Sequence, residues 1–486
     1  PRMPLVRQGH HIASEQRVIK FQKAQRMGRN MDVLIIGAGP AGMFAAEKLA
    51  DETNHTITVI DMGKESVNRK CSTLSRDMCT KCEPCDIYAG VGGAGALSDG
   101  KLNLTPHIGG DPESLHRNAD EIRRYIQKVD ETFLKYGADT DIFGVNDDDL
   151  NLLKRKASAH GIEFISGKQR HMGSDKTPLI IDKFYKELKQ KGVKFRTQTK
   201  IETIERSGEG FIARTEGEAF KADFIIAAPG RAGAYWFRTQ ARKLGIDNKY
   251  GPIDVGVRVE FPSTIYELIE EIMYDAKFKL YTYTYDDLVR TFCTNPCGFV
   301  TEERYPDFVM VNGHAKKDEK SENTNLAILS RIELTDPVED TTEYGRSIAR
   351  LATTIGGGKP ILQRFKDLAT GQRSTWTRLG RCQIAPTLRN ATPGDISMAL
   401  PHRIVTNIVE SIERLDSVIE GIASDSTLIY ASEIKFYDTK YPVTEHLETN
   451  IPNLFVAGDA SGHSRGIVYA AVTGILAAEG IVHKGD

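Results

Sequence analysis

A glycine motif between a short apolar run and a helical segment most constrains the fold of this chain. Residues 32–37 (DVLIIG) form the apolar run, and residues 37–42 (GAGPAG) fit the pattern G-x-G-x-x-G. The run predicts a buried parallel strand that ends in glycine and leads into a helix. Residues 56–61 (TITVID) alternate and are β-branched, which predicts the next strand. Together these segments predict one βαβ unit.

The residue types of this unit suit a dinucleotide. The first glycine permits the tight turn, the second lets the backbone approach a pyrophosphate, and the third lets helix and strand pack closely. The helix N-terminus then faces the phosphates with partial positive charge. Asp61 ends the second strand, 19 residues after Gly42, where its carboxylate accepts hydrogen bonds from ribose hydroxyls. The predicted cofactor contacts are Gly37, Gly39, Pro40, Ala41, Gly42 and Asp61.

A second motif distinguishes FAD from NAD, which share the first. Residues 449–459 (TNIPNLFVAGD) precede a glycine-rich turn and a helix, and they resemble the second FAD motif of the glutathione-reductase-like flavoproteins. The resemblance implies that Asp459, after Gly458, binds a ribityl hydroxyl, a group that NAD lacks. It also implies that the helix from Gly466 and Ile467 points its N-terminus at the flavin. Residues 227–231 (AAPGR) match a looser feature of the same superfamily, which implies cofactor contacts at Ala228 and Gly230.

Three longer stretches narrow the resemblance: residues 71–106, 394–401 (GDISMALP) and 461–475 (SGHSRGIVYAAVTGI). With them the chain, from about residue 31 onward, resembles a bacterial and archaeal family of FAD-dependent dehydrogenases. That family resembles, at a distance, the geranylgeranyl reductases and the fumarate-reductase and aspartate-oxidase flavoproteins. The resemblance implies FAD and an oxidoreductase activity, and it implies no particular substrate.

The cysteines form an unusual cluster. The chain has seven, and the odd number together with the tight spacing disfavours a secreted disulfide framework and favours a reducing cytoplasm. Three interpretations of the cluster stay open: ligands of an iron–sulfur cluster or zinc ion, redox thiols beside the flavin, or structural cysteines. The four candidate metal ligands are Cys71, Cys79, Cys82 and Cys85.

A glycine-dense stretch follows the cysteines. Residues 90–104 (GVGGAGALSDGKLNL) are predicted to lie against the ribityl chain and ring, because glycine lets the backbone approach a ligand closely. Gly93 and Gly95 are the predicted contacts. Ser98, Asp99 and Lys101 either meet the flavin or substrate or serve turn chemistry alone.

The candidates for proton transfer are spread along the chain. His463 follows the second FAD motif, His314 lies in VNGH, and Lys101 lies in the glycine-dense stretch. Arg465 suits an anionic substrate, and His402 is a weaker candidate. A structural role is the alternative for each of them.

Composition and pattern divide the chain. Residues 1–30 form a basic extension, and the net charge of -2 provides no overall field for nucleic acid or a membrane surface. No stretch reaches about 18 consecutive apolar residues, so the sequence does not predict a membrane-spanning helix. We expect an FAD-binding domain over 31–250, with a helical insertion at about 108–175, and its return over 430–486.

The region between is expected to form the substrate domain, residues 251–429. The runs VGVRVEF, KLYTYTY and DFVMVNG alternate at period two, which predicts a half-exposed antiparallel sheet, and residues 340–420 suggest helices with loops. The predicted fold class is therefore α/β: a Rossmann-type FAD-binding domain with a mixed, largely antiparallel α+β substrate domain.

The sequence favours an FAD-dependent oxidoreductase that transfers a hydride between flavin and a small organic substrate, by C–H oxidation or C=C reduction. The alternative is a non-redox flavin-binding regulatory or structural protein. We find no second strand-linked G-x-G-x-x-G, so NAD(P)H is expected only as a transient donor. A ferredoxin-like protein is the candidate redox partner.

Overall fold

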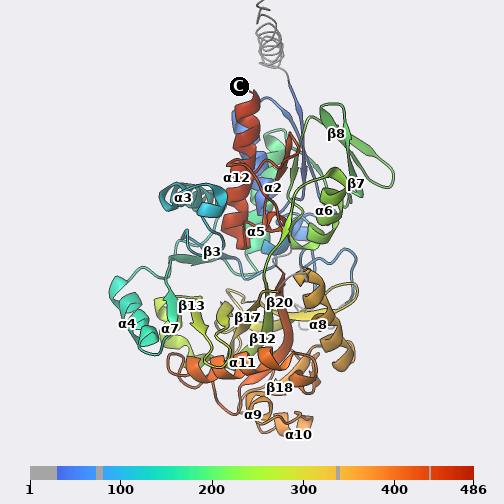
Figure 1. The fold of residues 1–486 in the computed structure, drawn as a ribbon. Helices are drawn as coiled ribbons and strands as arrows, with labels where there is room; N and C mark the ends of the chain where they lie inside the picture. The colour runs from blue at the N-terminus through green and yellow to red at the C-terminus, as the bar shows by residue number, and fades with distance from the viewer. Residues whose placement is uncertain (1–29, 73–79, 335–339, 437–438, 486) are drawn as a thin grey trace, which may run out of the picture.

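The structure, a computed structural model, describes residues 30–72, 80–334, 340–436 and 439–485. Figure 1 shows two parts stacked on each other, one holding α2 and α12 and the other holding β12 and β17. The predicted basic extension, apart from Asn30, and Cys79 lie outside the described residues.

The first part is built on a five-stranded parallel sheet. Strand β1 (Asp32–Ile36) lies at its centre between β10 and β2, and the register pairs Ile35 with both Ile226 and Val59. The order is β22 (Leu454–Val456), β10 (Phe224–Ala227), β1, β2 (Thr56–Ile60) and β6 (Lys194–Arg196). The two predicted FAD motifs, far apart in sequence, thus follow strands of one sheet.

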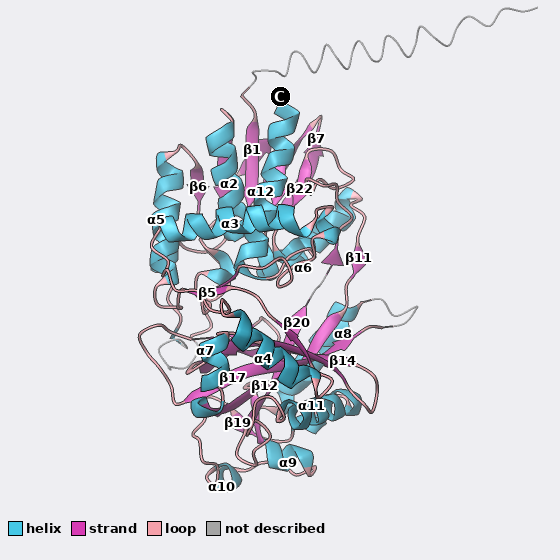
Figure 2. Ribbon diagram, turned by 90° about the vertical axis from the view of Figure 1, so that its left-hand side faces the viewer, coloured by secondary structure: helices cyan, strands magenta, loops and turns pink. Residues whose placement is uncertain are grey.

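Helices and a small sheet cover the two faces of this parallel sheet. Because adjacent side chains of a strand point to opposite faces, Val33 and Ile35 join one apolar core and Leu34 and Ile36 another. The first core contains α2 (Pro40–Glu52), α3 (Ala119–Lys135), α5 (Thr177–Gln190) and α12 (Gly466–Gly485). The second contains α6 (Gly230–Leu244) and the sheet of β7 (Thr203–Ser207), β8 (Gly210–Arg214) and β9 (Ala219–Ala222). This Rossmann-type arrangement confirms the predicted fold class (Figure 2).

The second part contains an eight-stranded sheet that is antiparallel except where β18 pairs with β19. Its order is β19 (Thr392–Pro393), β18 (Ile361–Arg364), β20 (Leu428–Phe436), β12 (Ile253–Pro262), β17 (Asn323–Ile332), β14 (Leu288–Asn295), β13 (Lys277–Tyr281) and β4 (Glu163–Ile165). Around it lie α4 (Asp147–Ser158), α7 (Glu267–Ile272), α8 (Thr341–Ile355), α9 (Phe365–Ala369), α10 (Trp376–Leu379) and α11 (His402–Leu415).

Three short strand pairs complete the described sheets. Strand β3 (Lys101–Asn103) pairs with β5 (Gln169–His171), and β11 (Lys249–Tyr250) pairs with β21 (Thr439–Lys440). Strands β15 (Phe299–Arg304) and β16 (Val309–His314) form a hairpin. The β3–β5 pair places Lys101 directly opposite His171.

The expectation of a half-exposed sheet holds for residues 280–283, where buried and exposed positions alternate, but it is wrong for β12. Strand β12 is buried at nine consecutive positions, so both of its faces are covered. Val255, Val257 and Val259 pack into an apolar core that includes α8 and α11. On the opposite face, Arg258 and Glu260 are equally buried. The alternation in the sequence therefore separates an apolar buried face from a polar buried face.

The expected helical character of two regions was incomplete. Within residues 108–175, β4 adds an edge strand to the large sheet by pairing with β13. Within residues 340–420, β18 pairs with β20. Both strands are short, four residues at most, and a short apolar run does not distinguish a strand from a helix.

Helix α12 has the length and apolar composition of a membrane helix over Gly466–Lys484. However, 78% of that stretch is buried inside the protein, where it packs against α2 and α3. Among the described residues it is the sole helix of this kind, and its packing is that of a central core helix.

Candidate active site

The first glycine motif forms the tight turn between β1 and α2. Gly37 has a φ of 108°, and a Cβ there would lie 2.1 Å from the carbonyl oxygen of Ala228, so only glycine fits. Helix α2 begins at Pro40, and its N-cap residue Gly39 has no side chain to cap the first amides. Those amides and the helix dipole suit a pyrophosphate.

Asp61 sits at the carboxyl end of β2, beside this turn. Its carboxylate accepts hydrogen bonds from the backbone N–H groups of Ala38 and Gly63, both at 2.8 Å. These contacts fix the carboxylate next to the glycine turn, at the place where the fingerprint requires a ribose ligand. The structure thus brings the predicted acid and the predicted turn together.

The second motif places Asp459 between β22 and α12. Ser464 and the backbone N–H of Gly466 donate hydrogen bonds to its carboxylate, and Arg231 approaches it at 3.9 Å. Burial raises the pKa of Asp459, while Arg465 and Arg231 oppose that shift. A Cβ at Gly466 would meet no atom within 4 Å, so the start of α12 borders open space.

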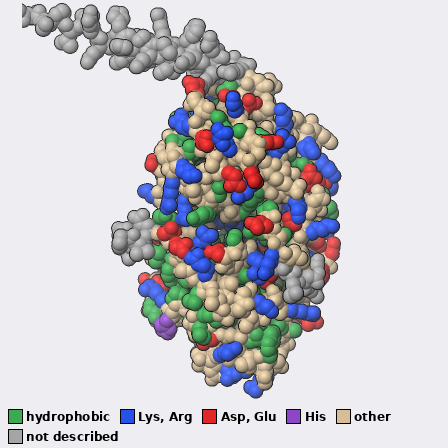
Figure 3. Space-filling model, turned by 90° about the vertical axis from the view of Figure 1, so that its right-hand side faces the viewer, with side chains coloured by type: hydrophobic (Ala, Val, Ile, Leu, Met, Phe, Trp, Pro, Cys, Tyr) green, Lys and Arg blue, Asp and Glu red, His purple; other side chains and the backbone are tan. Residues whose placement is uncertain are grey.

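The glycine-dense stretch packs against both motifs. A Cβ on Gly93 would lie 3.0 Å from the Cα of Gly39, and one on Gly95 would lie 2.8 Å from the Ile467 side chain. Two acids, two helix N-termini and a glycine cradle therefore converge, and this donor set fits FAD. Figure 3 shows a hollow at mid-height, between the two parts of the molecule.

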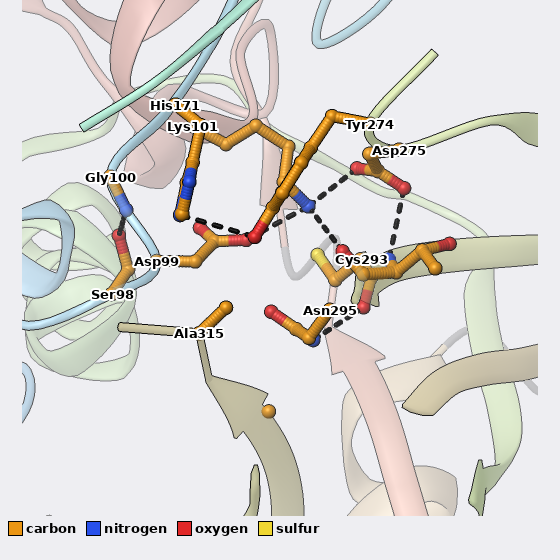
Figure 4. A network of polar contacts seen from close by, with 12 residues as sticks. Ser98, Asp99, Gly100, Lys101, His171, Tyr274, Asp275, Cys293, Asn295 and Ala315 are labelled. Carbon is orange, nitrogen blue, oxygen red and sulfur yellow. Dashed lines mark hydrogen bonds and ion pairs between the residues drawn. The ribbon is translucent and has the colours of Figure 1, made fainter. Parts of the chain in front are cut away.

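Lys101 connects this cradle to the second part of the molecule. Its buried ammonium contacts Asp99 at 2.8 Å, Asp275 at 2.7 Å and the Thr294 carbonyl at 2.8 Å (Figure 4). Burial alone would lower its pKa, but Asp275 and Asp99 raise the pKa above its ordinary value. Asp275 also pairs with Lys277 at 2.6 Å. Lys101 is therefore a fixed positive charge at the junction.

His171 and Tyr274 lie beside this cluster. Their rings stack with centroids 4.2 Å apart, and the Tyr274 hydroxyl lies 3.2 Å from Nε2 of His171. Burial lowers the pKa of His171 to about 4 and raises that of Tyr274 well above its ordinary value. Both side chains are therefore neutral at neutral pH, and they form a polar wall near Asp99 (Figure 4).

The polar face of the large sheet is organised around Arg258. This buried guanidinium makes a bidentate ion pair with Glu433, with both contacts at 2.7 Å. It also donates to Asn325 at 2.8 Å and to the Cys293 carbonyl at 3.1 Å. Charge-assisted, bidentate bonds of this kind hold neighbouring strands in a fixed arrangement.

His314, at the end of β16, is 4% exposed, and neither ring nitrogen has a hydrogen-bond partner among the described residues. Burial lowers its pKa to about 4. Asn295 and Asn325, both fully buried, each have one unpartnered side-chain atom in the described part of the chain, Oδ1 and Nδ2 respectively. Buried polar atoms of this kind are usually satisfied in folded proteins, by the chain, by ordered water or by a ligand.

Two of the other predicted candidates, His463 and Arg465, have hydrogen-bond partners in the described part of the chain, unlike His314. His463 hydrogen bonds through Nε2 to the Tyr441 carbonyl at 2.8 Å, and Arg465 donates to the backbone carbonyls of Asp459 and Ser464. These contacts hold the loop before α12. A chemical role for His463 or Arg465 stays a prediction, as does one for His402, the first residue of α11.

The structure describes three of the four clustered cysteines, Cys71, Cys82 and Cys85, each half-buried. Among residues 30–72, 80–334, 340–436 and 439–485, no group of three or more His, Cys, Asp or Glu side chains has the arrangement of a metal site. Because Cys79 lies outside these ranges, the iron–sulfur, zinc and redox interpretations all stay predictions.

Two family models match separate stretches of the chain. Residues 31–132 match the family described as pyridine nucleotide-disulphide oxidoreductase, and residues 252–435 match that described as FAD-dependent protein, C-terminal domain-like. Together with the cradle, these matches show that the chain is an FAD-dependent oxidoreductase. The first match covers the Rossmann-type part, and the second covers most of the part that holds the large sheet.

Comparisons over the whole chain do not identify a substrate. An uncharacterized protein of Clostridium beijerinckii is 27% identical over 93% of this chain and 81% of its own. Glycine oxidase from Geobacillus kaustophilus has a TM-score of 0.42 at 13% identity, over 94% of this chain and 95% of that one. L-proline dehydrogenase from P. horikoshii has a TM-score of 0.40 at 11% identity, over 93% of each chain. Structural similarities this weak carry no argument about chemistry.

Sequence reasoning missed several residues of the site, above all His171, Tyr274, Asp275, Asn295 and Asn325. One signal was present: Arg258 and Glu260 interrupt an apolar strand at every second position. A charged residue is rarely buried without a partner, so such a strand predicts a polar network on its second face. The partners themselves come from distant segments.

The buried histidines predict acid sensitivity. Their pKa values of about 4 lie below the ordinary 6.5, so the unfolded chain binds protons more readily than the folded protein between these pH values. Folding stability should therefore fall as the pH decreases from about 6.5 to 4. The loss is about 3 kcal/mol for each of His171 and His314. Denaturant unfolding at several pH values measures it.

The variant His314→Gln isolates one contribution, because glutamine does not titrate. We expect its stability to fall less steeply with acid than that of the parent, while His107→Gln, at an exposed position, follows the parent. Superimposable profiles for the parent and His314→Gln would contradict the assignment.

Proposed function

We propose that this FAD-dependent oxidoreductase transfers a hydride between its flavin and a small organic substrate held between residues 98–101 and the polar face of the large sheet. The observation that carries the proposal is the position of Lys101. Its chain segment continues from the glycines that pack on both FAD motifs, and its ammonium contacts Asp275 and Thr294 of the second part.

Bound FAD supplies a ring that accepts or donates two electrons as a hydride. The chain supplies the surroundings. Asp61, Asp459 and the two helix N-termini bind the cofactor. Lys101 holds a fixed charge where charge develops during transfer, and His314 presents a neutral imidazole that can accept a proton.

Residues of the large sheet complete the substrate side. Arg258 and Glu433 keep the strands in register, and the buried polar face excludes bulk water from the reacting atoms. These features favour catalysis over a purely structural cofactor, because a structural cofactor needs no buried, unpartnered polar groups beside it.

Bleaching of the flavin tests the proposal. We expect an anaerobic panel of alcohols, amines, enoates, NADH and NADPH to contain a donor or acceptor that changes the flavin redox state at rates near 1–10³ per second, the usual range for enzymes. Lys101→Met should retain flavin and slow that step by about 10²-fold or more, the cost of losing a preorganised charge.

Lys200→Met is the matched control, because Lys200 is 62% exposed on the first part of the molecule. It should leave the rate unchanged. Stoichiometric flavin whose redox state no member of the panel changes would refute hydride transfer to a small substrate.

A further inference from the structure

Hydrogen bonds fix the orientation of two buried amides beside the predicted substrate space. The Oδ1 atom of Asn325 accepts from Arg258 at 2.8 Å and from Asn295 at 3.3 Å, so it cannot be exchanged with the amide nitrogen. Asn295 also donates from Nδ2 to the Cys293 carbonyl at 2.7 Å. Its Oδ1 therefore points away from these partners and has no donor in the described chain.

Figure 4 shows this Oδ1 directed into the space bounded by Asn295, Ala315 and Asp99. Asn295 is fully buried. An acceptor in such a place costs about 1–3 kcal/mol when it lacks a hydrogen bond. A ligand that donates a hydrogen bond there would remove that cost.

Asp99 provides a second acceptor on the same space. One of its oxygens receives the Lys101 ammonium at 2.8 Å, and the other accepts no hydrogen bond from any side chain that the structure describes. The side chain is 13% exposed, so the chain does not seal it completely. Its charge acts on His171, His314 and Arg258, which come from three separate strands.

The four charges immediately around Lys101 balance. Lys101 and Lys277 match Asp99 and Asp275, and all three protons of Lys101 are engaged by Asp99, Asp275 and Thr294. The two polar side chains that Figure 4 shows bordering this space, Asp99 and Asn295, both present acceptors to it. It suits an uncharged O–H or N–H group, and it disfavours a carboxylate, which would face the oxygens of Asp99 and Asn295.

We propose that this space, the Asp99–Asn295 chamber, binds the hydroxyl or amino group on the carbon that is oxidised, so that the substrate is an alcohol or an amine. The proposal rests on the proposed hydride transfer, and it selects one direction of that transfer, from the substrate to the flavin. The substrate C–H bond breaks and its hydride reduces the flavin. The O–H or N–H bond breaks and its proton goes to the free oxygen of Asp99. A C=O or C=N bond forms.

Four probes of one shape test the binding preference in the holoenzyme: cyclohexanol, cyclohexylamine, cyclohexanone and cyclohexanecarboxylate. Binding is read from the absorption spectrum of the oxidised flavin, without turnover. We expect the alcohol, the amine or both to bind about tenfold or more tightly than the ketone and the carboxylate, the effect of one buried hydrogen bond. Tighter binding of the ketone or carboxylate, or no spectral change with any probe, would overturn the proposal.

Asn295→Leu removes the amide acceptor and should bring the four dissociation constants to within about threefold of one another. Asn295→Asp preserves the shape of the side chain and still offers an acceptor, so it should keep the preference for donors. This variant tests the proposal if Asn295→Leu does not fold. The matched control is Asn248→Leu, in the first part of the molecule, where the preference should persist. An unchanged preference in Asn295→Leu would overturn the role of the chamber.

Asp99→Asn tests the proton step, because asparagine still accepts a hydrogen bond but is not a base. We expect unchanged binding of the alcohol and amine and flavin bleaching slowed by about 10²-fold or more. Bleaching by other donors but by neither alcohol nor amine would overturn the chamber proposal and leave hydride transfer standing. Flavin that no compound bleaches would instead contradict hydride transfer itself.

Discussion

The double variant Asp61→Ala with Asp459→Ala should purify without flavin. Each acid offers a charged hydrogen-bond acceptor at the cradle, worth about 1.5–3 kcal/mol. Their joint loss should weaken FAD binding by on the order of 10²–10⁴-fold. The flavin-to-protein ratio after gel filtration, from absorbance, measures the effect.

Asp425→Ala is the control for this experiment, because that carboxylate is 65% exposed and pairs only with Lys366 in the described chain. It should retain full flavin. If the double variant also retains stoichiometric flavin, Asp61 and Asp459 are not the ribose and ribityl ligands.

Asp275→Asn should destabilise the protein by about 3–5 kcal/mol, the usual cost of removing one partner from a buried ion pair. The Asp275 side chain is 1% exposed and accepts from Lys101, Lys277 and the Thr294 N–H. Lys101 keeps Asp99 when Asp275 is lost, whereas Lys277 keeps no acid within the described residues. Equilibrium unfolding in denaturant measures the loss.

A second substitution shows whether the buried charge is the cause. In Asp275→Asn with Lys277→Met, no unpaired ammonium remains at position 277, so the double variant should be more stable than the single one. Equal stability of the two variants, or a loss below about 1 kcal/mol for the single variant, would show that solvent or another group neutralises Lys277.

The sequence predicted the cofactor half of the site better than the substrate half, for a physical reason. FAD contacts depend on short contiguous motifs, in which a turn and a helix N-terminus are set by neighbouring residues such as Gly37 and Pro40. The structure then places Asp61 and Asp459 at ends of parallel strands of one sheet. A local sequence pattern is sufficient to predict a binding group when neighbouring residues create that group.

The substrate half depends on contacts between distant segments. Lys101 was predicted as a candidate, but its partner Asp275 lies 174 positions along the chain, and Arg258 is 175 positions from Glu433. Alternation at period two predicted the strands, but it could not show whether their polar face contacts solvent or a second buried layer. Asn295 and Asn325 are defined by hydrogen bonds they lack, which no sequence pattern displays.

The position of α12 has a consequence for how the protein is made. This helix packs between α2 and α3, and the Asp459 turn before it supplies one cofactor acid, while β22 closes the edge of the parallel sheet. The ribosome produces β1, α2 and β2 long before these segments. The early βαβ unit must therefore leave the tunnel with part of its apolar surface uncovered, and FAD capture becomes a late event that follows the synthesis of α12.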